Sequence, residues 1–316
     1  LTCTATNWPI LANGLDIKWV DIDPTTGNIC PEDLRRKISP KTKVITFVHW
    51  GGTPVDLDAI SAVQDYAYEK FGFRPMVIED CAHAIGAEWR SNRIGNLKHG
   101  NICTFSLQAI KHLTTGDGGL ICLPNAELFE RTKLSRWYGI DRDKRNYKGK
   151  DFRLESDVAE YGFKMHMNDI AAVIGIANLP YLESNLLKMR QNAQFYQNAL
   201  CDVRGITLLD IPASACSSFW LFSFHIQDKM EFIEYMKKRG VMASQVHGRN
   251  DMHTVCAPFR THLPNLDRAE KTFISIPVGW WLTRENLEHI VSSIKCFCGN
   301  LTVPRAINPR KIIITG

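Results

Sequence analysis

The chain has 316 residues, 45% of them hydrophobic and 22% charged, an ordinary composition for a globular protein with one large or two modest domains. Its 38 basic and 33 acidic residues leave a net charge of +5 without a Lys/Arg-rich block, so nothing indicates nucleic-acid binding. No apolar run approaches the roughly 20 residues of a membrane helix. Ten cysteines without CxxC pairs suit free thiols in a reducing compartment. We therefore expect a cytoplasmic protein without a membrane segment.

The first 70 residues alternate between strand and helix patterns. We expect the end of a strand leading into a helix at residues 1–11, strands at 16–23 and 43–48, a short helix opened by Pro31, and a surface helix at 56–68. Strands that alternate with helices in this way predict a parallel sheet with right-handed crossovers.

Two short apolar runs, 76–78 and 102–105, each end abruptly at polar residues. Runs of this length suit buried parallel strands, and in open α/β sheets the reactive groups lie where such strands end. Asp80 and His83 follow the first run, and Ser106 and Lys111 follow the second. The pattern therefore predicts a site made from these four side chains.

Pyridoxal phosphate chemistry needs residues of these types. A lysine amine must be neutral to form a Schiff base, and a carboxylate such as Asp80 keeps the pyridine nitrogen protonated. A hydroxyl such as Ser106, with backbone N–H groups at a helix start, suits the phosphate. Spacing alone leaves a plainer alternative open, in which Asp80 ends a strand, Ser106 caps a helix and Lys111 is solvated.

The second half of the chain changes character at residue 191. Before it we expect a helix at 127–138, a charged loop at 141–151 and a long helix at 170–187 that ends or kinks around Pro180. After it, helices and strands at 191–200, 219–226, 229–239, 275–277 and 286–297 predict a small α+β domain. The expected division is a large domain at 1–190, a small domain at 191–300 and a linker at 301–316.

Two motifs give the chain a family resemblance. E-D-C-A-H-A-I-G-A at 79–87, followed by F-S-L-Q-A-I-K-H-L-T-T-G-D-G-G at 105–119, resembles the DegT/DnrJ/EryC1/StrS sugar-nucleotide aminotransferases, and the likeness extends to about residue 298. The resemblance implies the fold type I architecture of pyridoxal phosphate enzymes: a mostly parallel sheet with helices on both faces and a small C-terminal α+β domain. It also implies that Lys111 is the Schiff-base lysine and Asp80 the partner of the pyridine nitrogen.

The same resemblance assigns further residues. His83 stands beside the cofactor ring, Ser106 binds the phosphate, and Thr6 matches the cofactor-site pattern, whereas Cys3 replaces a stacking aromatic residue. Lys164 occupies the position of an Asn that reaches the phosphate of a neighbouring subunit, which implies a homodimer with shared sites. The substrate candidates are His49, which matches a loop histidine of the family, and His247 and Arg249, which lie where the small domain contacts the sugar nucleotide. The alternatives are a packed loop histidine for His49, a surface lysine for Lys164, and an ordinary polar loop for His247 and Arg249.

The resemblance implies transfer of an amino group from glutamate to a nucleotide-diphosphate keto-deoxysugar, with pyridoxal 5'-phosphate as cofactor and no metal. Two alternatives remain at this point: a related dehydratase, against which Lys111 argues because that branch has histidine there, and a non-catalytic protein of the same fold. We also expect the chain to be a piece of a longer product. A phosphate loop should precede Leu1, and residues 310–316 read as the start of a further nucleotide-binding domain.

Overall fold

The computed structural model describes residues 1–143 and 157–299. Its central sheet has the order β1-β2-β5-β6, in which β1, β2 and β5 are parallel and β6 is antiparallel to β5. These strands are β1 (Val44–Val48), β2 (Met76–Asp80), β5 (Ile102–Ser106) and β6 (Gly119–Cys122). The predicted buried strands at 43–48, 76–78 and 102–105 are therefore confirmed.

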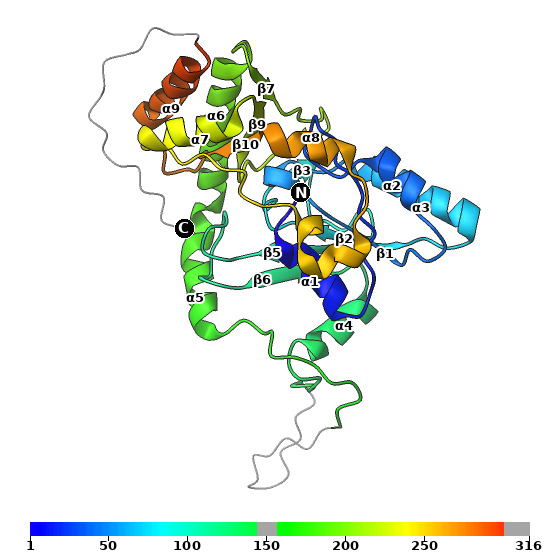
Figure 1. Cartoon of the computed structure of the whole chain (residues 1–316). Helices are drawn as coiled ribbons and strands as arrows, with labels where there is room; N and C mark the ends of the chain where they lie inside the picture. The colour runs from blue at the N-terminus through cyan, green and yellow to red at the C-terminus, as the bar shows by residue number, and fades with distance from the viewer. Residues whose placement is uncertain (144–156, 300–316) are drawn as a thin grey trace.

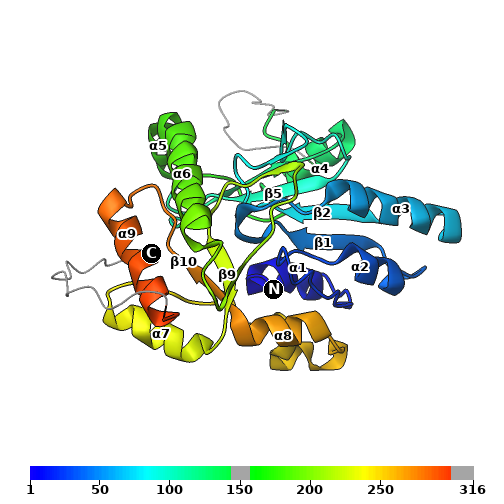
Figure 2. The same ribbon diagram turned by 90° about the horizontal axis from the view of Figure 1, so that it is seen from above.

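Helices cover this sheet in the way a parallel sheet requires (Figures 1 and 2). They are α1 (Thr4–Ala12), α2 (Pro31–Lys37), α3 (Leu57–Phe71) and α4 (Ala126–Ser135). The helix α3 begins where the Asp56 side chain accepts a hydrogen bond from the Ala59 N–H, and it ends at Gly72, whose φ of 77° lies in the left-handed region. Its apolar face packs with α2, β1 and β2 in one core.

A second group of elements forms a three-stranded antiparallel sheet with helices against it. The strands, in the order β10-β9-β7, are β7 (Ile206–Leu208), β9 (Phe222–Ile226) and β10 (Phe273–Ile276), and the helices are α7 (Lys229–Lys238), α8 (Pro264–Thr272) and α9 (Arg284–Phe297). Short strands β3 (Glu88–Trp89), β4 (Asn92–Arg93) and β8 (Ala215–Cys216) form a third sheet. The three-stranded antiparallel sheet and helices α7 and α9 share a core of their own, in which Phe224, Phe232 and Ile294 are fully buried.

One long helical rod runs between the two groups (Figure 2). It consists of α5 (Asp169–Asn178), a 3₁₀ turn at Leu179–Tyr181 and α6 (Leu182–Leu200). The kink predicted at Pro180 is that 3₁₀ turn, after which α6 continues through residue 190. The domain boundary at 190 stays a prediction, although the separate cores favour two units.

Several sequence expectations change. Residues 16–23 form no strand; an isolated bridge joins Ile22 to Ile29. The strand expected at 219–226 begins only at Phe222, and helix α8 was not predicted. The greater part of the predicted loop at 141–151, and residues 301–316 with their proposed nucleotide-binding turn, lie outside the described residues.

Candidate active site

Asp80 is the last residue of β2, and two hydrogen bonds fix its carboxylate. The Thr6 hydroxyl of α1 donates to Oδ2 at 2.6 Å, and the Ala82 N–H donates to Oδ1 at 3.0 Å. A carboxylate accepts further hydrogen bonds beyond these two. Asp80 is thus held at the carboxyl end of a parallel strand with accepting capacity left for a ligand.

Lys111 lies on the turn that follows β5 and is half-buried. Burial lowers the pKa of its amine from 10.5 to about 8, and the negative charge of Asp80 acts in the opposite direction. A buried lysine loses hydration of its charged form, so its neutral amine is populated nearer to neutral pH. The structure therefore gives Lys111 the reactive amine that a Schiff-base lysine needs, with the Asp80 carboxylate nearby.

His83 and His247 lie beside this pair. Their rings are nearly parallel, with centroids 5.9 Å apart, and His83 Nδ1 and His247 Nε2 are both buried without a hydrogen-bond partner. Burial, followed by the charge of Lys111, holds the pKa of His83 well below 6.5 and lowers the pKa of His247 to about 4. Two neutral imidazoles with open nitrogens are thus available to a ligand.

Trp220 is a residue of this site that the sequence analysis missed. Its ring centroid lies 3.8 Å from Lys111 Nζ and 3.9 Å from the centroid of the His83 ring. The expected strand at 219–226 made it an ordinary strand residue. The available signal was a tryptophan at the start of an apolar run, two residues after a pair of serines.

Ser106 ends β5, two residues beyond Thr104, which pairs with Asp80 in the neighbouring strand. The residues that directly follow Ser106 form turns and not a helix, and its Oγ accepts a hydrogen bond from Gln108 N at 3.3 Å. The expected phosphate site at a helix start is therefore wrong in that detail. The Ser106 hydroxyl and the turn that follows it are the parts of the expected phosphate site that the structure retains.

Lys164 is exposed, and its backbone forms a bridge with Trp137. Neighbouring residues hold this segment: Met165 N donates to Arg136 O at 2.9 Å. The side chain is free to reach outward, as a contribution to a second subunit requires.

His49 has the place of the packed loop histidine that the sequence left open, and not a place at the substrate. It is fully buried, its Nδ1 accepts from Val55 N at 3.0 Å, and its Nε2 lies 2.9 Å from Glu79 Oε2. Because Nδ1 accepts, Nε2 carries the proton and donates to Glu79. Both nitrogens are used, so the assignment of His49 to the substrate gains no support. Cys81 lies near this pair, but the protonated Nε2 has no lone pair for a metal.

Arg249 is also engaged elsewhere. Its guanidinium pairs with Asp251 at 2.7 Å, with Asp267 and with Glu270 at 3.4 Å, and only 8% of its side chain is exposed. These carboxylates hold the pKa of Arg249 above its ordinary value. Arg249 thus joins its own loop to α8, and the prediction that it contacts the substrate is not supported by this geometry.

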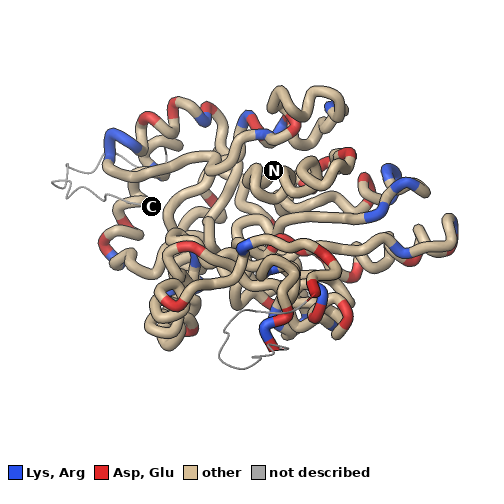
Figure 3. The backbone as a smooth tube through the Cα atoms, turned by 90° about the horizontal axis from the view of Figure 1, so that it is seen from below, with Lys and Arg blue, Asp and Glu red and all other residues tan. Residues whose placement is uncertain are grey.

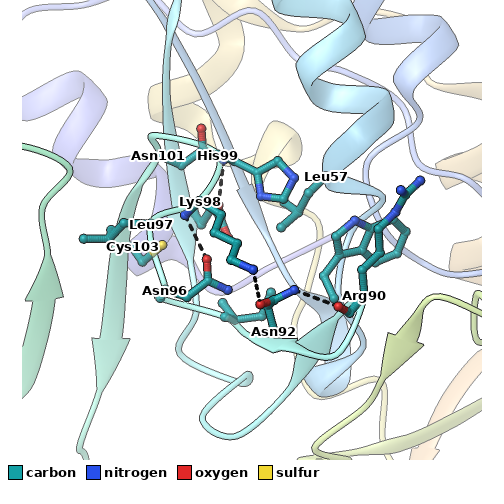
Figure 4. Close-up of a pocket in the computed structure, with 13 residues that line it drawn as sticks. Leu57, Arg90, Asn92, Asn96, Leu97, Lys98, His99, Asn101 and Cys103 are labelled. Carbon is teal, nitrogen blue, oxygen red and sulfur yellow. Dashed lines mark hydrogen bonds between the residues drawn. The ribbon is translucent and has the colours of Figure 1, made fainter.

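A separate cavity of about 200 Å³, whose lining includes none of these site residues, is shown in Figure 4. Glu79 lines it, while the next residue, Asp80, points to the opposite face because successive strand side chains alternate. Side chains of the 89–101 segment line the cavity, among them Lys98, which donates to Asn92 Oδ1, and Asn92, which donates to the Arg90 carbonyl.

These features define the class of protein. A model of the DegT/DnrJ/EryC1/StrS aminotransferase family matches residues 1–295. The chain belongs to this family, and its mixed α/β architecture with a mostly parallel sheet is that of fold type I.

Several relatives show the closeness of the match. The sugar aminotransferase CalS13 from Micromonospora echinospora is 43% identical with a TM-score of 0.89, covering 94% of this chain and 78% of its own. AtS13 from Actinomadura melliaura is 48% identical with the same TM-score and coverages. The uncharacterized protein MJ1066 from Methanocaldococcus jannaschii is 29% identical over 88% of this chain and 72% of its own.

The residues present fit pyridoxal phosphate. The amine of Lys111, the fixed carboxylate of Asp80 and the unpartnered buried nitrogens of His83 and His247 match a ligand with an aldehyde and a basic ring nitrogen.

Proposed function

We propose that the protein is a pyridoxal phosphate-dependent aminotransferase that moves an amino group from glutamate to a keto-deoxysugar linked to a nucleotide diphosphate. The observation that carries the proposal is the arrangement at the carboxyl ends of β2 and β5, where Thr6 fixes the carboxylate of Asp80 and the turn after β5 carries the half-buried amine of Lys111. Identity above 40% to a solved sugar aminotransferase supports the sugar as acceptor. Glutamate and the nucleotide rest on the family resemblance.

Each residue of the site has a distinct role in this proposal. Lys111 attaches the cofactor and, once released, moves a proton between the cofactor and the substrate carbon. Asp80, oriented by Thr6, keeps the ring nitrogen protonated, and His83 lies beside the ring. Bound there, the cofactor supplies an electron sink for the substrate carbanion. Its phosphate is bound by Ser106 and by Lys164 of a second subunit.

His247 is the substrate candidate that the geometry favours. It lies beside His83 with an unpartnered nitrogen, at the end of the site formed by the small domain. A neutral imidazole can accept a hydrogen bond from, or donate one to, a sugar hydroxyl.

Attachment of pyridoxal phosphate to Lys111 should depend on pH. The neutral amine attacks the aldehyde, and the pKa of Lys111 is about 8. We expect the rate of attachment to the apoprotein to rise as pH increases from 6.5 and to level off above pH ~9, one unit past that pKa. Stopped-flow absorbance measures it. A rate still rising steeply at pH 9.5 would place the lysine pKa near that of a solvated amine.

The proposed homodimer accounts for a large apolar surface. No residue of α5 is buried, and Ile170, Val173 and Ile176 are at least 65% exposed. The segment Asp169–Leu200 has the length and apolar composition of a membrane span, and 6% of its most apolar window is buried. Its second half, however, packs Tyr196 and Leu200 into a protein core. A second copy of the chain covers such a one-sided face, consistent with a cytoplasmic enzyme.

Shared sites give the dimer a testable property. Lys111→Ala and Lys164→Ala chains are each expected to be inactive alone, but a mixed dimer should contain one site with both lysines intact. When the two variants are mixed after mild dissociation, we expect each mixed dimer to regain about half the activity of a wild-type dimer, because one of its two sites is intact. Tagged purification of the mixed dimer provides the measurement. Absence of recovery in verified mixed dimers would place Lys164 within its own subunit or outside the site.

The function itself is tested by a screen. Purified protein with pyridoxal phosphate and glutamate is offered keto-sugar nucleotides that differ in nucleotide and keto position, and formation of 2-oxoglutarate and amino sugar is followed by mass spectrometry. Stoichiometric amino-sugar formation supports the proposal. Conversion of a substrate with loss of a hydroxyl and no gain of nitrogen would favour the dehydratase instead.

A further inference from the structure

Trp220 contacts both the catalytic lysine and the turn that carries it. Its indole Nε1–H donates to the Ile110 carbonyl at 2.9 Å, and its ring centroid lies 3.8 Å from Lys111 Nζ. The ring also stacks on His83, with planes 20° apart. Aromatic faces attract an ammonium group, most strongly when both are shielded from water.

The backbone before Trp220 holds the indole in this position. Phe219 has a φ of 50°, the left-handed region that bulky residues seldom adopt. Such a conformation persists where the surroundings determine it. Here the preceding residues, Ser217 and Ser218, are buried and held by four hydrogen bonds. Ser218 donates twice, from Oγ to the His83 carbonyl at 2.8 Å and from its N–H to the Gly52 carbonyl at 3.0 Å. The two serine carbonyls accept, Ser217 O from Arg190 Nε at 3.0 Å and Ser218 O from His112 Nε2 at 3.1 Å.

The segment therefore reaches the site as a rigid unit. It connects β9 of the small sheet to the loops that carry His83 and His112, and it ends with the indole against Lys111. Within the described residues, the other tryptophans of the second sheet group, Trp280 and Trp281, are about half-exposed and make no such contact with a lysine.

We propose that Trp220 is a positioning residue that holds the amine of Lys111 whenever that amine is not bonded to the cofactor. The proposal rests on the aminotransferase function. Transamination requires the lysine to leave the cofactor, accept a proton from the substrate carbon and deliver it to the cofactor carbon on the other side of the nitrogen being transferred. A long flexible side chain must stay in reach throughout, and the indole face restricts it. After the amine accepts the proton, the same face stabilises the ammonium.

Nuclear magnetic resonance of the apoprotein tests the contact without the reaction. Reductive ¹³C-methylation labels the lysines, and the Lys111 signal is identified by its absence in Lys111→Arg. An amine over an indole face should resonate upfield of exposed lysines because of the ring current. We expect Trp220→Leu to remove this upfield shift, Trp220→Phe to retain part of it, and the control Trp281→Leu to leave it unchanged. A Lys111 signal at the same position in Trp220→Leu would overturn the proposal.

Kinetics tests the consequence. We expect Trp220→Leu to slow the exchange of the α-deuterium of labelled glutamate about tenfold. A loss of this size lies within the range of a shielded cation–π contact. Borohydride should still fix one cofactor per chain in this variant, which shows that cofactor attachment is unchanged. Trp220→Phe should stay within about threefold because its aromatic face remains. If Trp220→Leu fails to fold, Trp220→Met replaces it. Equal losses in the Phe and aliphatic variants would overturn the role of the aromatic face. If wild type shows no exchange, the proposed function fails, and the resonance measurement still decides the contact.

Discussion

Replacing Lys111 by alanine should abolish covalent attachment of pyridoxal phosphate while the fold is retained. Lys111 is half-buried on a turn, and no ion pair of the described residues depends on its amine, so its loss removes the reactive group and one contact with the Trp220 ring. Wild-type protein treated with cofactor and borohydride should carry one modified peptide, containing Lys111. The Lys111→Ala chain should carry none, with an unchanged circular dichroism spectrum.

The matched control is Lys238→Ala, at the exposed end of α7. Removal of this solvated lysine should leave attachment at its wild-type level. A borohydride-stable adduct of equal stoichiometry in Lys111→Ala would mean that another lysine forms the bond, and the proposed role of Lys111 would be lost.

Replacing Asp80 by asparagine should preserve cofactor binding and reduce transamination by several orders of magnitude. A neutral amide cannot hold the proton on the pyridine nitrogen, so the cofactor loses its electron sink. The substitution keeps the size of the side chain at the end of β2. Single-turnover absorbance changes with glutamate give the rate, and cofactor titration gives the affinity.

Thr6→Val separates charge from orientation. It removes the hydroxyl that donates to Asp80 Oδ2 at 2.6 Å but keeps the carboxylate. A net hydrogen bond to a charged group is worth about 1.5–3 kcal/mol, so we expect the rate to fall roughly ten- to a hundredfold, well short of the fall in Asp80→Asn.

The Asp80 prediction has its own contradicting outcome. Near-normal turnover in Asp80→Asn would show that a different carboxylate serves the ring nitrogen.

The strand ends were predictable from sequence because they depend on local pattern. The apolar runs before Asp80 and Ser106 become β2 and β5, and parallel pairing alone then brings the following residues to one edge of the sheet. The residues at 16–23 alternate just as regularly, yet they have no strand partner there. The Asp21 carboxylate instead accepts from the N–H groups of Asn265 and Leu266 at the start of α8, 244 residues away in sequence.

Side chains with distant partners were not predictable. His49 and Arg249 looked free in sequence, because the Glu79 that pairs with one and the α8 carboxylates that pair with the other are brought to them by folding. Trp220 was missed for the same reason. The position of its ring depends on the left-handed φ of Phe219, a backbone conformation that a phenylalanine in the sequence does not indicate.

The hydrogen bonds of Glu79 also bear on how accurately the sheet assembles. His49 follows β1, Glu79 lies in β2 and Asn101 precedes β5, so the bonds at 2.9 and 2.7 Å connect β2 to the chain segments of the strands on both sides of it. A slip of β2 by one residue would turn Asp80 into the interior and Glu79 toward Lys111. The slipped sheet would bury a carboxylate without its two donors, at a cost of several kcal/mol. The hydrogen bonds among His49, Glu79 and Asn101 thus favour the correct register of β2. The one-residue slip that would inactivate the enzyme is also the slip that this buried carboxylate makes unstable.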